Sequence, residues 1–81
     1  MNDVTTTIRN YISKNILFSE NDYPYSDEDS FIEKGVIDSM NVLELINFIE
    51  ERFGIKVVDY EIIPENFDSI DKLTAYVGSK L

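Results

Sequence analysis

Three segments of the chain place apolar residues three and four positions apart, and this spacing predicts three helices. They cover about residues 3–18, residues 39–53, and a last stretch from Asp68 or Ser69 to about residue 79. The apolar arc is widest in the middle segment, which is typical of the central helix of a small bundle. The apolar positions are Val4, Ile8, Tyr11, Ile12 and Ile16, then Met40, Val42, Leu43, Leu45, Ile46, Phe48, Ile49 and Phe53, then Ile70, Leu73, Tyr76 and Val77.

The long segment before the middle helix is rich in turn-forming residues. Residues 19–38 are therefore expected to be a loop without regular structure, of a length that usually marks a functional or well-packed segment. Phe31 and Ile32 are expected to anchor this loop to the core. Tyr23 and Tyr25, which are amphipathic, are expected to lie at the surface.

The segment after the middle helix begins at Gly54, which suits the end of a helix. Residues 55–58 are apolar, but the chain offers no second strand to pair with them, so we expect a loop that packs inward. Residues 59–63 are predicted to form one short helical turn that Pro64 ends. The pattern as a whole predicts a single all-α domain spanning residues 1–81.

Composition excludes several kinds of chemistry. The 81 residues include no cysteine and no histidine, so disulfides, thiol catalysis, cysteine-ligated zinc and a histidine general base are all excluded. The net charge of −9 disfavours nucleic acid and anionic membrane surfaces as partners, and favours partners with basic patches. Because no apolar run approaches the ~20 residues needed to span a bilayer, and no signal peptide is evident, we expect a cytoplasmic protein with no membrane insertion. Because histidine and cysteine, the commonest metal ligands, are absent, we also expect no resident metal.

Ser39 lies directly before the middle helix and allows three interpretations. It is a helix N-cap, a catalytic serine, or a serine that carries a phosphate-linked group. A catalytic serine needs a base, and only Lys34 and Asp38 lie nearby in sequence. A phosphate suits the positive end of a helix, where backbone N–H groups are free. Asp38 would help to hold magnesium in a transferase complex, and Gly35 lets the chain turn into the helix.

The sequence around Ser39 resembles the phosphopantetheine-attachment region of acyl and peptidyl carrier proteins. The similarity covers nearly the whole chain, including its length, its acidity and its long first loop. The motifs are Gly35-Val36-Ile37-Asp38-Ser39-Met40, Val42-Leu43-Glu44-Leu45, Glu50-Glu51-Arg52-Phe53-Gly54-Ile55 and Phe67-Asp68-Ser69-Ile70. The resemblance implies a four-helix bundle with a short third helix.

The resemblance also implies a function. A phosphopantetheinyl transferase would attach 4′-phosphopantetheine from coenzyme A to Ser39, and the terminal thiol of this arm would hold an acyl group as a thioester. The chain would then be a monomeric carrier, not an enzyme, that delivers its cargo to acyl-processing enzymes. In such carriers the middle helix meets the partners. The positions that match are Met40, Leu43, Glu44, Glu50 and Glu51; the alternative is core packing for the first two and a solvated face for the glutamates.

The cargo stays open between two kinds of carrier. Carriers of fatty acid synthesis often have Leu-Gly-x-Asp-Ser-Leu, whereas this chain has one more residue between Gly35 and Asp38. That form resembles stand-alone carriers of specialised lipid or natural-product pathways. It also resembles aminoacyl or peptidyl carriers, including D-alanyl carriers, that an adenylating ligase loads. A third alternative, from another class, is a small acidic interaction domain in which Ser39 only caps the helix.

Overall fold

The computed structural model describes residues 2–38 and 40–81, and within them every regular element is helical. The elements are α1 (Asn2–Tyr11), the π-helical turn η1 (Ile12–Ile16), α2 (Phe31–Lys34), α3 (Asn41–Phe53), the 3₁₀ turn η2 (Asp59–Glu61), α4 (Pro64–Phe67) and α5 (Ile70–Lys80). The predicted all-α fold of the carrier type is confirmed.

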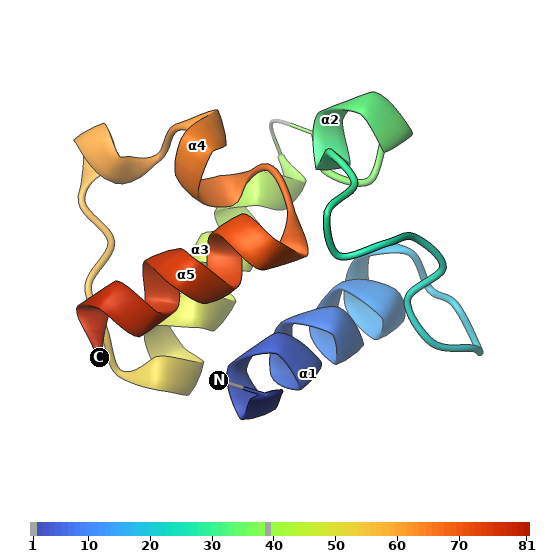
Figure 1. Cartoon of the computed structure of the whole chain (residues 1–81), viewed down its shortest axis with the longest axis horizontal. Helices are drawn as coiled ribbons and strands as arrows, with labels where there is room; N and C mark the ends of the chain where they lie inside the picture. Colours follow the sequence, from blue (N-terminus) through green and yellow to red (C-terminus); the bar gives the residue numbers. More distant parts are fainter. Residues whose placement is uncertain (1, 39) are drawn as a thin grey trace.

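The three long helices form the body of the molecule and the two short ones lie along one edge. In Figure 1, α3 lies behind α5, α1 runs beside α5 along the lower edge, and α2 and α4 lie at the upper edge. The core that they enclose is apolar and tightly buried. Its most deeply buried members are Ile8, Ile12, Phe31, Leu45, Ile49, Ile70, Leu73 and Val77.

The first helix ends in a strained turn, close to its predicted end. The Leu17 amide donates to the Ile12 carbonyl at 2.9 Å, five residues back, which closes the π-helical turn. Phe18 then adopts a left-handed conformation with φ of 53° although it is not glycine. The chain is tied down here by Ser13, a buried serine whose hydroxyl donates to the Asn21 carbonyl at 2.7 Å.

The long loop differs from its prediction in three respects. It contains the short helix α2, which Ser30 caps by accepting a hydrogen bond from the Glu33 amide at 3.2 Å. Phe31 is buried as expected, but Ile32 is 65% exposed and does not anchor the loop. Tyr23 is buried instead of lying at the surface, and this burial raises its pKa to about 12. A four-residue helix is too short to show a hydrophobic period, which is why the sequence pattern missed it.

The segment after α3 largely follows its prediction. Gly54 ends the helix in a left-handed conformation, with φ of 66°, and residues 55–58 form an inward-packing link in which Val57 is buried. Pro64, however, does not end a turn at residue 63; it begins α4, at a position where its missing N–H costs nothing. Ser69 caps α5 by accepting from the Lys72 amide at 3.1 Å.

Candidate functional site

The N-terminus of α3 is organised by Asp38. One oxygen of its carboxylate, Oδ1, accepts hydrogen bonds from the amides of Met40, at 3.0 Å, and Asn41, at 2.8 Å. The Asp38 backbone carbonyl accepts from the Val42 amide at 3.0 Å. Asp38 is therefore the residue that caps α3, and its negative charge lies at the positive end of the helix.

This capping by Asp38 affects two of the expectations for Ser39, that its side chain caps α3 and that free N–H groups of α3 hold a phosphate there. A cap at position 39 would accept from the amides of Asn41 or Val42, and both of these donate to Asp38. The same donors were expected to be free for a phosphate, and they are not free. The helix dipole still attracts an anion to this end of α3, and the negative charge of the Asp38 carboxylate partly offsets that attraction.

Ser39 itself, the predicted attachment residue, lies outside the described residues. Its neighbours in sequence are both described and both exposed, Asp38 and Met40, the latter to 77%. Lys34, the lysine considered as a base for a catalytic serine, holds its Nζ 5.8 Å from the centre of the Tyr25 ring. No group of three or more acidic side chains that could hold a metal ion occurs within residues 2–38 and 40–81.

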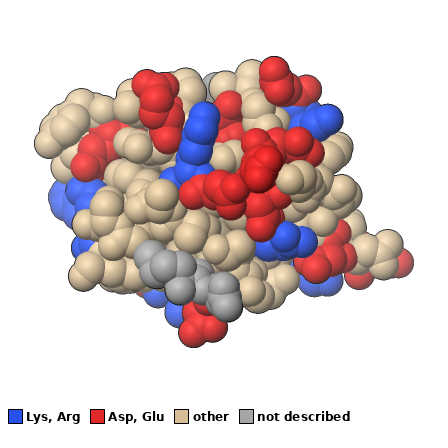
Figure 2. Space-filling view, in the orientation of Figure 1, with Lys and Arg blue, Asp and Glu red and all other residues tan. Residues whose placement is uncertain are grey.

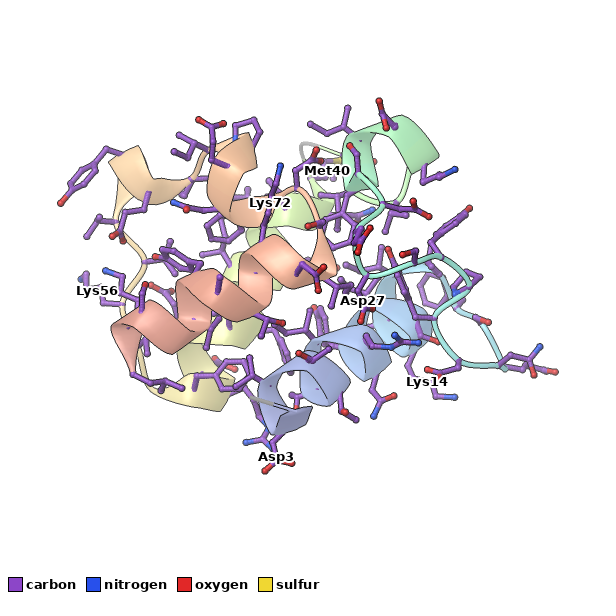
Figure 3. The ribbon with its side chains drawn as sticks, in the orientation of Figure 1. Asp3, Lys14, Asp27, Met40, Lys56 and Lys72 are labelled. Carbon is purple, nitrogen blue, oxygen red and sulfur yellow. The ribbon has the colours of Figure 1, made fainter. Side chains whose placement is uncertain are left out.

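The predicted partner-contact residues fall into two groups. Met40, Leu43 and Glu44 are exposed and lie three and four positions apart, so they share one outer face of the α3 segment. Leu43 is 62% exposed and Met40 is 77% exposed, so core packing is excluded for both. The Met40 side chain is labelled in Figure 3. Glu51 is also exposed. Glu50 is half-buried, and its Oε2 accepts from the Val57 amide at 3.0 Å, so it holds the link after α3 in place.

Helix α1 holds α3 through contacts beside this outer face. The Tyr11 ring stacks on Phe48 with ring centres 3.9 Å apart, and the Tyr11 hydroxyl donates to the Glu44 carbonyl at 3.4 Å. Burial, with a smaller contribution from the Glu44 carboxylate, raises the pKa of Tyr11. Because Leu45 and Ile49 on the other side of α3 are fully buried, the outer face is presented on a helix that is held both by α1 and by the core.

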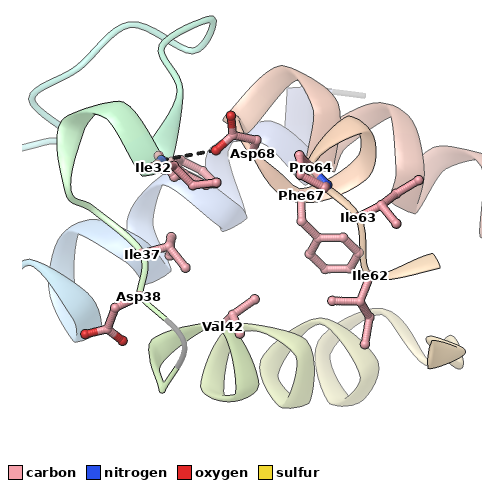
Figure 4. A pocket seen from close by; sticks show the side chains of 10 residues that line it. Ile32, Ile37, Asp38, Val42, Ile62, Ile63, Pro64, Phe67 and Asp68 are labelled. Atoms are coloured by element: carbon pink, nitrogen blue, oxygen red, sulfur yellow. Dashed lines mark hydrogen bonds between the residues drawn. The ribbon is translucent and has the colours of Figure 1, made fainter. Parts of the chain in front are cut away.

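An apolar cleft opens beside Asp38. Its volume is about 260 Å³, and it lies between α2, the start of α3 and α4. Figure 4 shows Ile37, Val42 and Phe67 around it, with Asp38 at one side and Asp68 at the other. The sequence pattern did not single out this cleft, because its walls come from segments about 30 residues apart in sequence and include α2, which was not expected.

The surface is predominantly acidic. Figure 2 shows acidic side chains gathered across the middle of one face, with basic side chains scattered around them. Asp27 is paired with Arg9 at 2.7 Å. None of the helices within the described part of the chain is both long enough and apolar enough to cross a membrane.

No family model matches the chain, but comparison with curated proteins gives its family. Two curated relatives, both named D-alanyl carrier protein and both from Streptococcus suis (strains 05ZYH33 and 98HAH33), are 40% and 39% identical to it over 75 residues. Each match covers 93% of this chain and 91% of the relative. Together with the all-α fold, this similarity shows that the chain belongs to the acyl and peptidyl carrier protein family.

Proposed function

We propose that Ser39 carries 4′-phosphopantetheine and that the chain presents a cargo, held on this arm, to partner enzymes. The observation that carries the proposal is the capping of α3 by Asp38. Because the Asn41 and Val42 amides donate to Asp38, the helix does not need the Ser39 side chain as its cap. A serine that is not needed for capping, between two exposed neighbours, is well suited to modification by a transferase.

The surroundings of position 39 fit the group. The cleft beside Asp38 is lined mainly by apolar side chains, among them Ile37 and Val42, and suits the carbon chain of an arm or its cargo. The Asp38 carboxylate uses Oδ1 for the cap, and Oδ2 has no hydrogen-bond partner among residues 2–38 and 40–81. In the transferase complex this oxygen is suited to bind magnesium. When bound, the group would supply the terminal thiol that holds an acyl group as a thioester.

The chain's own contribution is presentation, not catalysis. It has no histidine and no cysteine, and of the two candidate bases near Ser39 in sequence, Lys34 holds its Nζ beside the Tyr25 ring and Asp38 caps α3. Tethering raises the effective concentration of the cargo at each partner's active site. Exposed Met40 and Leu43, with Glu44 and Glu51 beside them, form the surface that we assign to partner docking, whereas Glu50 contributes less because its carboxylate is engaged. We expect the carrier to act as a cytoplasmic monomer.

For the cargo we favour an aminoacyl group, of the D-alanyl type, loaded by a ligase that activates the free amino acid with ATP. The names of both relatives support this choice, and so does the spacing from Gly35 to Asp38. The second candidate is a longer acyl intermediate, and the apolar cleft of about 260 Å³ is the observation in its favour. The remaining alternative is an interaction domain that carries no prosthetic group.

Intact-mass measurement tests the attachment. Incubation with coenzyme A, magnesium and a promiscuous phosphopantetheinyl transferase should add one phosphopantetheinyl group per chain. Ser39→Ala should abolish the addition, and the matched control Ser79→Ala, at an exposed serine in α5, should be modified like the wild type. No mass gain in the wild type would favour the interaction domain, and modification of Ser39→Ala would move the site elsewhere.

Competitive loading tests the cargo. The modified protein is offered D-alanine with ATP and a D-alanine–carrier ligase, and separately malonyl-coenzyme A with a malonyl transferase from fatty acid synthesis. We expect the ligase to load D-alanine as a hydroxylamine-sensitive thioester and the malonyl transferase to load little. Efficient malonyl loading with none from the ligase would reverse the assignment and restore an acyl role.

A further inference from the structure

Asp68 makes a set of contacts that lies outside the site described so far. It follows α4 directly, and it binds the start of α2 with three hydrogen bonds. Its backbone carbonyl accepts from the Phe31 amide at 2.7 Å, Oδ1 accepts from the Ile32 amide at 3.1 Å, and Oδ2 accepts from the Ser30 hydroxyl at 2.6 Å. We call these three bonds the Asp68 clamp.

The clamp compensates for the weakness of α2. Helix α2 has only four residues, and a helix of this length does not form without outside contacts. The first N–H groups of a helix have no partner within it, and here Phe31 and Ile32 give theirs to Asp68. Ser30 is therefore bound twice, as the cap that accepts from the Glu33 amide and as a donor to Asp68. The position of α2 depends on a residue that lies 36 to 38 positions away in sequence.

Helix α2 in turn fixes the segment that leads to Ser39. Gly35 ends the helix with φ of 67°, and the next amide, that of Val36, donates to the Phe31 carbonyl at 2.9 Å. Val36 is 2% exposed, so this segment is held by the core as well as by α2. Only Ile37 separates it from Asp38, the cap of α3. The chain before Ser39 is thus held at one end by the Asp68 clamp and at the other by Asp38.

We propose that Asp68 is a positioning residue for the modification of Ser39, acting through α2. This inference depends on the proposed attachment at Ser39. Asp68 touches neither the proposed docking surface nor the cap of α3, so its loss should leave docking largely intact while the segment before Ser39 loses its fixed position. Figure 4 shows the bond from Ile32 to Asp68 at the edge of the apolar cleft, so the clamp also joins two walls of that cleft.

The test is transferase kinetics on two substitutions at one position. Asp68→Ala removes both side-chain bonds of the clamp, and kcat for phosphopantetheine transfer should fall about tenfold with KM nearly unchanged, because misplacement of a reacting group lowers the rate of the bound complex. Asp68→Asn keeps an acceptor for the Ile32 amide and can donate to the Ser30 oxygen, so kcat should return to within about threefold of the wild type. Asp71→Ala, at an exposed aspartate in the first turn of α5, removes the same charge without touching the clamp.

The outcomes separate this inference from the proposed function. If the wild type is not modified at all, the attachment itself is wrong. If the wild type is modified and Asp68→Ala keeps the kcat of Asp71→Ala, attachment stands and the positioning role is refuted. An Asp68→Asn variant as slow as Asp68→Ala would also refute it, because the charge would then matter and not the clamp. Amide chemical shifts provide a readout without the transferase: Asp68→Ala should move those of Val36 and Ile37, and Asp71→Ala should not.

A graded variant covers the case in which Asp68→Ala does not fold. Ser30→Ala removes the bond to Oδ2 and the cap of α2, but it leaves the bonds from the Phe31 and Ile32 amides in place. Circular dichroism would first establish that it is helical. Its kcat should then fall between those of the wild type and the fully released clamp, and an unchanged kcat would overturn the proposal.

Discussion

Replacement of Asp38 separates two roles that the structure gives to one carboxylate. Asp38→Ala removes the acceptor for the Met40 and Asn41 amides. Because Asp38 is exposed, water can reach these amides in the variant, so the loss should be near the typical value for an N-cap, about 1 kcal/mol in the free energy of unfolding. For a domain of this size that corresponds to a Tm lowered by about 4–8 °C.

Asp38→Asn is the matched control. Asparagine caps a helix about as well as aspartate, so the variant should lose less than about 0.5 kcal/mol, chiefly from the lost charge at the positive end of α3. Its modification, however, should be slow, because an amide is a poorer ligand for magnesium than a carboxylate. Thermal unfolding and transferase kinetics are measured on both variants. An unchanged Tm in Asp38→Ala would refute the capping argument, and wild-type kinetics in Asp38→Asn would refute the role in magnesium binding.

Three further predictions concern stability and docking. Tyr23→Phe should raise the free energy of unfolding by about 1 kcal/mol, because the buried Tyr23 hydroxyl has no partner among the described residues; a lower Tm would show that the hydroxyl is bonded. The wild type should be more stable than Glu61→Gln at neutral pH, because hydrogen bonds from Lys80 and Tyr76 lower the pKa of folded Glu61. The extra free energy of unfolding of the wild type should be complete above the ordinary glutamate pKa of about 4.3, and it should disappear as the pH falls through the lower pKa of Glu61 in the folded state. A stability difference between the two proteins that is constant with pH would contradict this prediction. Glu44→Lys should slow loading by the ligase, and salt should slow loading of the wild type; rates that do not change in either case would place recognition on apolar Met40 and Leu43.

The long helices could be predicted from the sequence because their stability depends on a repeated pattern. The spacing in α1, α3 and α5 is local information, and so is Gly54, whose left-handed conformation ends α3. The short elements could not be predicted in the same way. Helix α2 exists because Asp68 binds its first amides, and α4 begins at Pro64, a residue that also suits the end of a turn. Nothing in the local sequence of residues 19–38 reveals a partner that lies beyond residue 60.

The sequence proposes where the candidate site lies, but it could not reveal the hydrogen bonds around it. For Met40 and Leu43 the spacing left core packing and partner contact open, and their exposure rules out core packing. The assignment of capping between Asp38 and Ser39 could not be made from sequence either, because both residue types cap helices well. For Glu50, the hydrogen bond from Val57 depends on how the chain folds back after Gly54.

The two aspartates that flank the apolar cleft suggest why a carrier of this size keeps such a short second helix. Val36 anchors the segment before Ser39 in the core, but Asp38, its last residue, is exposed, and an exposed position gains little stability from apolar packing. Under the proposed function, this end must stay accessible to the enzymes that act on the carrier. Hydrogen bonds from the start of α2 to Asp68, and from the start of α3 to Asp38, hold the chain on both sides of this exposed end without covering it. If this is the reason for the arrangement, then the Asp38→Ala and Asp68→Ala changes, made together, should slow modification by about the product of their separate effects, because they act on different ends of the segment. A double variant no slower than either single one would show that both aspartates act on a single event, and the segment would then behave as one rigid unit.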